Sequence, residues 1–551
     1  MYLRTTESDR LTRALLALGM LGALSASPAA WAQHQGHVAH PGLVPQELLE
    51  RTVPLRQGIG NLHETVSTSS KEAQGFYDQG LDYVHSFEWI EAGRSFHQAL
   101  RLDPNLAMAY VGLSDVYIGL QDPSQARPAL EKAQALAGKV SDRDRQRIEI
   151  RARQLEYMES GGDMQKYFAY RKQIADALTT YPDDPWLWIM RGFAEEGTPT
   201  GHGQGGTIDT VAFYETALAL SPDNFAAHHY LTHTFENLGR TREAIEQSEA
   251  YVRLAPAIPH AHHMHGHELR RVGRTQEAVA EFRKADELEN AYYTAEHVDS
   301  NLDWHHGHNL GLLAMCYQSL GQMKFAELTY RQFFAFPAQT DVAEFNQREW
   351  PNFLLDRGRY PEALEAAQAL IAKSNTPMGR FAGHTAAGSA LLGMDRVEDA
   401  RTELGLAERE MELVPAVIVG SLPNAGALRA ELLLCEQKLT EAEPLARQIE
   451  ERVRAMPGPD SWSEALFQLQ AIARAAQRSG DWDLAEFTGR QMIEHDPSYA
   501  GGYYVLGLSA EHRGDGGEAR QQFLAAQKRW TDADFDLPEL VHVHQALAAK
   551  N

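Results

Sequence analysis

The sequence predicts an all-α protein, a right-handed superhelical solenoid built from roughly 11–12 helix–turn–helix hairpins. A spacing of 34 residues recurs in several residue types, as between Pro222 and Pro256 and between Gly239 and Gly273. The chain has 551 residues, which exceeds one ordinary domain and suits an array of repeats. Because a single hairpin cannot bury its own apolar face, we expect neighbouring hairpins to stack into one continuous core.

The clearest unit, residues 73–106, carries six residues with matching physical roles. Gly80 lets the two helices approach closely, Phe96 fills the space between them, and Pro104 ends the second helix. The remaining three are Tyr83, Ala92 and Ala99. This order of Gly, Tyr, Ala, Phe, Ala and Pro resembles the tetratricopeptide repeat (TPR). The resemblance implies a solenoid whose concave groove binds a protein or peptide partner.

The first 32 residues have the features of a secretory signal peptide. Arg4 and Arg10 precede an apolar stretch over residues 15–26, which is too short to span a bilayer comfortably. Ala30-Trp31-Ala32 supplies the pattern of small residues that signal peptidase needs. We expect an exported protein, periplasmic or secreted, with no membrane insertion after cleavage. An uncleaved membrane anchor is the alternative.

The remainder divides into three predicted parts: a flexible segment with His and Pro (33–60), the solenoid (61–535) and a C-terminal capping helix (536–551). The clearest units of the solenoid are 73–106, 107–140, 225–258, 259–290, 307–337, 381–414, 466–499 and 500–531. A glycine-rich loop over residues 197–206 and an insertion over about 290–304 interrupt the period. The formal net charge of −24 argues against a nucleic-acid partner, which would need a basic surface.

The histidines follow the repeat. Of 24 in the chain, thirteen lie between His202 and His308. Each unit can be numbered so that the small residue of its first helix stands at place eight. Places two, five, nine and twelve then form a stripe that faces the groove. In the unit starting at Phe225 this stripe contains His229, His233 and Glu236. In the next unit, which starts at Pro259, it contains His260, His263, His267 and Arg270. In the following unit His308 stands at place two, one turn after His305.

This register predicts a metal site. It places an H-x-x-x-H pair on each of two adjacent inner helices, and packed helices lie roughly 8–10 Å apart, so we expect imidazoles from both helices to meet around one ion. The predicted ligands are His229, His233, His263, His267 and His308. Imidazole ligands suit Zn, Cu, Ni or Fe, and the sequence does not choose among them. His260, Arg270 and His305 are predicted to bind other groups in the groove.

Two functions are compatible with this pattern. The first is an exported scaffold that binds a peptide or protein in its groove and carries the metal site, or uses the histidines only as hydrogen-bonding groups. The alternative is a metal-dependent enzyme, hydrolase-like, in which Glu236 is the general base and Arg270 holds an anionic substrate. The first function does not require catalysis.

Four segments also resemble a group of exported bacterial TPR proteins with His-rich central repeats and poorly defined function. They are HETVSTSSKEAQGFYDQGL (63–81), HHYLTHTFE (228–236), HAHHMHGHELRRVGR (260–274) and WHHGH (304–308). The sequence departs from the group's pattern at His265 and Gly266, where Pro and Ser are usual. The resemblance implies that the important positions are His229, His233, Glu236, His260, His263, His267, His305 and His308.

Overall fold

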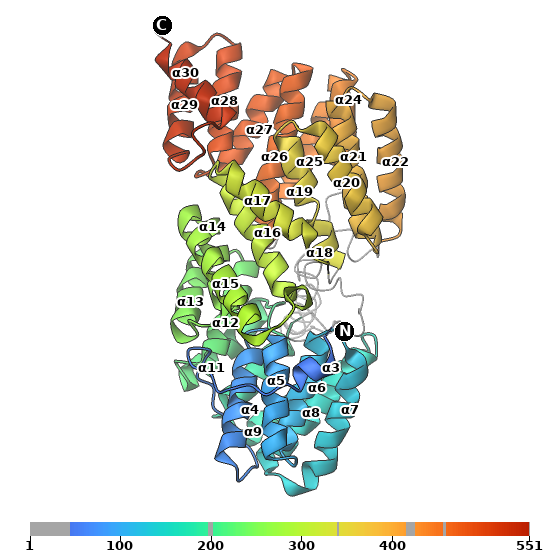
Figure 1. Cartoon of the computed structure of the whole chain (residues 1–551), viewed down its shortest axis with the longest axis vertical. Helices are drawn as coiled ribbons and strands as arrows, with labels where there is room; N and C mark the ends of the chain where they lie inside the picture. The colour runs from blue at the N-terminus through green and yellow to red at the C-terminus, as the bar shows by residue number, and fades with distance from the viewer. Residues whose placement is uncertain (1–43, 197–201, 339–340, 415–424, 456–458, 550–551) are drawn as a thin grey trace, which may run out of the picture.

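The computed structural model describes residues 44–196, 202–338, 341–414, 425–455 and 459–549. Throughout these ranges the regular structure is helical and contains no strand. Consecutive helices pair as hairpins and stack side by side along the long axis of the molecule (Figure 1). The prediction of an all-α solenoid is therefore confirmed.

The first half of the solenoid consists of six hairpins. They are α4 (Lys71–Val84) with α5 (Trp89–Leu102), α6 (Ala107–Gly119) with α7 (Pro123–Leu136), α8 (Asp142–Glu159) with α9 (Met164–Thr180), α10 (Pro185–Phe193) with α11 (Ile208–Leu220), α12 (Phe225–Asn237) with α13 (Thr241–Leu254), and α14 (Pro259–Arg271) with α15 (Thr275–Glu296). Part of the predicted insertion at 290–304 is helical, since it lengthens α15 and adds the short helix η3 (Ser300–Leu302).

The second half continues the same pairing. Its helices are α16 (Trp304–Ser319) and α17 (Met323–Ala335), α18 (Asp341–Asn346), α19 (Glu349–Asp356) and α20 (Tyr360–Lys373), α21 (Pro377–Gly393) and α22 (Val397–Glu412), α24 (Gly426–Cys435) and α25 (Leu439–Ala455), α26 (Pro459–Ser479) and α27 (Trp482–His495), and α28 (Ala500–His512) and α29 (Gly516–Arg529). Helix α30 (Pro538–Ala548) follows as a single helix at the C-terminal end (Figure 1).

The hairpins α14–α15 and α28–α29 share one close contact between their two helices. A Cβ atom at Gly266 would lie 2.9 Å from the ring of Phe282, and one at Gly507 would lie 2.4 Å from the ring of Phe523. Both rings are fully buried between the two helices of their hairpin. Glycine at place eight is therefore required where a phenylalanine sixteen residues later fills the hairpin, as Gly266 and Phe282 do.

The superhelix returns on itself, so segments far apart in the sequence touch. The backbone N–H of Ala257 donates to the carbonyl of Gly58 at 2.8 Å, and that of Asp534 donates to the carbonyl of Gly321 at 3.0 Å. The turn after α4 packs in the same way on the inner face of α12, where the ring of Phe87 lies 4.7 Å from that of His229. The inner face at α12 to α16 is therefore partly covered by an earlier part of the chain.

The two ends of the chain were predicted to lie outside the repeats. The predicted signal peptide and residues 33–43 of the predicted flexible segment fall outside the described residues. Of the remainder of that segment, Leu48, Leu49 and Val53 are buried against the first hairpin. At the other end α30 packs on α29. None of the described helices combines the length and the apolarity that a membrane span requires.

Candidate metal centre

The inner histidines gather in two groups of three. The first group is His229, His233 and His260, and the second group is His263, His267 and His308. Within each group the ligand nitrogens all lie within 4.8 Å of one another. Both groups combine places five and nine of one inner helix with place two of the next, so the repeat builds the same arrangement twice.

The first group converges through the Nε2 atoms. Nε2 of His229 lies 3.1 Å from Nε2 of His233 and 3.1 Å from Nε2 of His260. Two nitrogens bound to one tetrahedral ion by bonds of about 2.0–2.1 Å lie about 3.3–3.4 Å apart, which is close to these distances. Nδ1 of His229 donates to the backbone carbonyl of His85 at 2.7 Å. Its Nε2 is therefore left with a lone pair that points into the group.

In the second group, a hydrogen bond at Nδ1 orients both histidines of the pair. Nδ1 of His263 donates to Oδ1 of Asn309 at 3.0 Å, and Nδ1 of His267 donates to the Glu236 carboxylate at 3.3 Å. The amide of Asn309 cannot be reversed without cost, because its Nδ2 donates to the carbonyl of Phe282 at 2.9 Å. The Nε2 atoms of His263 and His267 therefore both present lone pairs, and they lie 2.9 Å apart.

Burial keeps four of these imidazoles neutral, namely His229, His233, His260 and His263. Desolvation lowers the pKa of His229 to about 3. It also lowers the pKa of His233, His260 and His263 well below the ordinary value, and neighbouring histidines add a smaller effect of the same sign. A neutral imidazole is the form that ligates a metal. These four imidazoles therefore have the required protonation state at neutral pH.

His305 lies between the two groups. Its ring is 5.0 Å from that of His260 and 4.5 Å from that of His263. Its Nδ1 lies 2.5 Å from a carboxylate oxygen of Glu289, which stands on α15. Its Nε2 is buried and has no hydrogen-bond partner within the described part of the chain. His305 is thus a further imidazole, oriented by a carboxylate, next to both groups.

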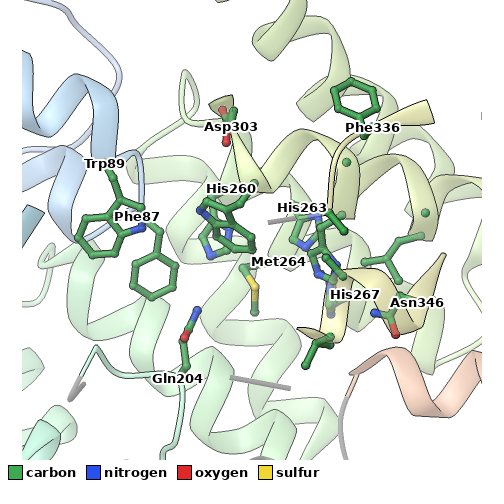
Figure 2. A pocket seen from close by; sticks show the side chains of 18 of the residues that line it. Phe87, Trp89, Gln204, His260, His263, Met264, His267, Asp303, Phe336 and Asn346 are labelled. Atoms are coloured by element: carbon green, nitrogen blue, oxygen red, sulfur yellow. The ribbon is translucent and has the colours of Figure 1, made fainter. Parts of the chain in front are cut away.

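A cavity of about 180 Å³ opens along these histidines (Figure 2). Phe87 and Trp89 lie on one side of His260, while His263, His267, Phe336 and Asn346 follow on the other side. The lining is largely aromatic, aliphatic and amide in character. Histidines of both groups belong to it, namely His233, His260, His263, His267 and His308.

The structure groups the predicted ligands differently from the sequence. The repeat register predicts that the pairs His229–His233 and His263–His267 meet around one ion. Instead His260, which was assigned to the groove, joins the first pair, and His308 joins the second. The physical reason is that the start of each inner helix, rather than its middle, lies beside the pair on the preceding helix.

Glu236 and Arg270, the other two polar residues predicted for the site, lie in different surroundings. Glu236 lines the cavity, but its carboxylate accepts from His267 and lies 3.5 Å from Nη1 of Arg271. Arg270 is buried beside the thiol of Cys316 and is not among the described side chains that line the cavity. It is therefore not placed to hold a substrate there.

The stacked hairpins define an α-helical repeat protein with an internal, histidine-lined cavity. Family models for the tetratricopeptide repeat match residues 107–139, 259–292 and 471–534. The chain therefore contains tetratricopeptide repeats. The second of these matches contains His260, His263 and His267, so both histidine groups include residues of a matched repeat.

Similar solved structures include a TPR protein, YrrB, described as having an unusual peptide-binding site (15% identity, 37% of this chain, 95% of that chain, TM-score 0.26). Yeast Tom70 shares 13% identity over 86% of this chain and 96% of its own, with a TM-score of 0.32. The human IFIT1 dimer with PPP-AAAA shares 11% over 82% and 95%, with a TM-score of 0.37. These similarities are too distant to assign a role to the residues of the site. No curated protein sequence matches the chain.

Proposed function

We propose that this protein is an interaction scaffold with a metal centre. Its concave face binds a protein or peptide partner, as the repeat family supports. Its inner histidines hold two transition-metal ions, one in each group of three. Because residues 1–32 have the features of a signal peptide, the proposal places this function outside the cytoplasm, in the periplasm or the medium.

One observation carries the metal proposal. The Nε2 lone pairs of His263 and His267 face each other at 2.9 Å, because Asn309 and Glu236 hold the protons on both Nδ1 atoms. Two acceptors at this distance repel each other unless a cation lies between them. A proton is disfavoured there, because burial lowers the pKa of His263 well below its ordinary value. A metal ion satisfies both lone pairs.

The nature of the donors limits the choice of metal. Three imidazoles per group suit Zn, Cu, Ni or Fe, whereas Mg and Ca prefer oxygen ligands. The hydrogen bonds to the Nδ1 atoms match the outer contacts that usually orient metal-binding histidines. The sites are therefore proposed for transition metals.

Metal analysis of the tag-free, full-length chain tests the proposal. After removal of metal and titration with Zn²⁺ or Co²⁺, we expect two ions per chain. His233→Ala and His267→Ala should each retain one ion, and the double variant should retain none. The matched control is His228→Ala, since His228 lies on α12 but bonds Gln247 and the carbonyl of Pro222 instead. Folded protein that binds no ion at micromolar metal, or equal loss in the control, would contradict the proposal.

The contacts of Glu236 favour an orienting role over a catalytic one. Its Oε1 accepts from Nδ1 of His267 and lies beside Nη1 of Arg271, so this oxygen is already engaged and is poorly placed to take a proton from a bound water. The metal-dependent hydrolase with Glu236 as general base is for this reason not the function proposed here.

A further inference from the structure

We infer that the metal-loaded cavity binds an aromatic carboxylate, with the ring between the aromatic walls and the carboxylate on a metal ion. This inference rests on the proposed function, because it requires that the two groups of histidines hold metal. It names the chemistry of the group that the cavity takes from a partner or from solution. Three features of the cavity support it: its charge, the direction of its coordination sites and the composition of its walls.

The charge of the loaded cavity calls for an anion. An imidazole that ligates a metal carries no charge, so two divalent ions would bring about four positive charges. Glu236 and Asp303 are the acidic side chains among the described residues of the lining. None of those residues is a lysine or an arginine. A buried excess of positive charge is costly unless an anion compensates it. An anionic oxygen donor supplies this charge and is also a ligand.

The open coordination positions face the cavity. Three protein ligands leave a fourth position in a tetrahedral site. In the first group His229 is fully buried and is not part of the cavity lining, whereas His233 and His260 line the cavity. In the second group all three imidazoles line it. A donor atom that enters the cavity can therefore reach either ion without moving the histidines.

The walls on both sides of the histidines suit an aromatic ring. Phe87 and Trp89 stack on each other, with ring centroids 5.7 Å apart, at one end. Phe333 and Phe336 belong to the lining at the other end (Figure 2 shows Phe336). Trp304 stacks over His308, one of the proposed ligands, at 6.1 Å. Aromatic faces of this kind recognise a ring by stacked and edge-to-face contacts.

Visible spectroscopy of the Co²⁺-loaded, full-length protein tests the inference with phenylacetate as the probe. Replacement of a water ligand by a carboxylate changes the cobalt d–d bands, so we expect a saturable change. Acetate, which lacks the ring, should bind at least about tenfold more weakly. Benzylamine and benzyl alcohol, which lack the carboxylate, should leave the bands unchanged. Equal binding of benzyl alcohol and phenylacetate would overturn the inference.

A pair of phenylalanines on one hairpin supplies the matched variants. Phe336→Ala removes part of the cavity wall and should weaken phenylacetate at least about tenfold while two cobalt ions remain bound. Phe325→Ala should change nothing, because Phe325 is exposed on α17 and does not belong to the lining. Equal affinities in the parent and both variants would overturn the assignment of the aromatic wall.

The source of the carboxylate is resolved by two peptides. The tripeptide Ala-Ala-Phe should bind if the group is the C-terminal residue of a partner, and its C-terminal amide should not. Binding of phenylacetate without the tripeptide would identify a small molecule as the source. If cobalt fails to bind, the proposed function fails. If two ions bind and neither phenylacetate nor the tripeptide alters the spectrum, only this inference fails.

Discussion

The repeat formed by α14 and α15 and the repeat formed by α28 and α29 share one hairpin and differ on the inner face. Both keep glycine at place eight against a buried phenylalanine. Places five and nine of α14 are His263 and His267, whereas those of α28 are Tyr504 and Leu508. Tyr504 packs beside Trp530 at 5.7 Å, at the end of the array. One set of places thus carries a pair of histidines in one repeat and makes apolar contacts in another.

The comparison shows what a repeat position does and does not determine. The register fixes which side chains share a face, and the residue type decides whether that face can bind a metal. The surroundings of the face decide the protonation state of its histidines. The earlier turn that carries Phe87 covers the first group and lowers the pKa of its imidazoles, whereas His512 at the end of α28 stacks on Trp482 near the surface.

The largest effect is expected when the inner face of α14 is converted into that of α28. The double substitution His263→Tyr and His267→Leu should abolish the second ion and leave the first, because His229, His233 and His260 are retained. Metal content and calorimetric titration measure this, with circular dichroism as a check on the fold. Loss of both ions in a folded variant would show that the two groups do not bind independently.

The shared hairpin contact is tested by removing the phenylalanine from each repeat. Phe282→Ala and Phe523→Ala should each lower the free energy of unfolding by about 3–5 kcal/mol, since both rings are fully buried against a glycine. Urea unfolding measures the loss. Only Phe282→Ala should also weaken metal binding, because its ring lies 5.5 Å from that of His263. An equal effect of Phe523→Ala on metal affinity would contradict this separation.

Much of the fold could be predicted because its determinants are local. The contact of place eight with the phenylalanine sixteen residues later lies within one hairpin, so the spacing reveals it. The faces of His229, His233, His263 and His267 followed from the same register. Their grouping did not, because it depends on which end of the next helix lies opposite.

Other parts of the site carry no signal in the sequence. Phe87 reaches the histidines only because the superhelix returns on itself, and this depends on the sum of many small rotations between hairpins. The carbonyl of His85 orients His229 as a backbone group, which any residue could supply. Asn309 directly follows a histidine, yet no motif marks it as the partner of His263.

A buried carboxyl in the C-terminal region gives a pH dependence that can be compared with the histidine region. Glu450 on α25 is buried beside Thr488, and desolvation raises its pKa to about 7. Because the folded state holds the proton more tightly than the unfolded state, this contribution is fully present below pH 4.5 and is lost as the pH rises through about 7.

The expected loss of stability between pH 4.5 and 8 is at most about 3 kcal/mol, and Glu450→Gln should remove it. Urea unfolding at several pH values measures the slope. The control Glu494→Gln, at an exposed position on α27, should keep the parental slope. A slope unchanged in Glu450→Gln would show that this carboxyl is ionised in the folded state.

The smallest effect is expected when a hydrogen-bond partner of one histidine group is changed, because only the ion of that group should bind more weakly. Glu236→Gln removes the charge that accepts from Nδ1 of His267, so the second ion should bind about 10–100-fold more weakly and the first should change little. Titration of the metal-free protein with Zn²⁺ measures both affinities. The control is Glu243→Gln on α13, whose carboxylate pairs with Arg240 at the surface. If the second ion binds Glu236→Gln as tightly as the parent, Glu236 does not orient His267, and its carboxylate becomes available for a catalytic role.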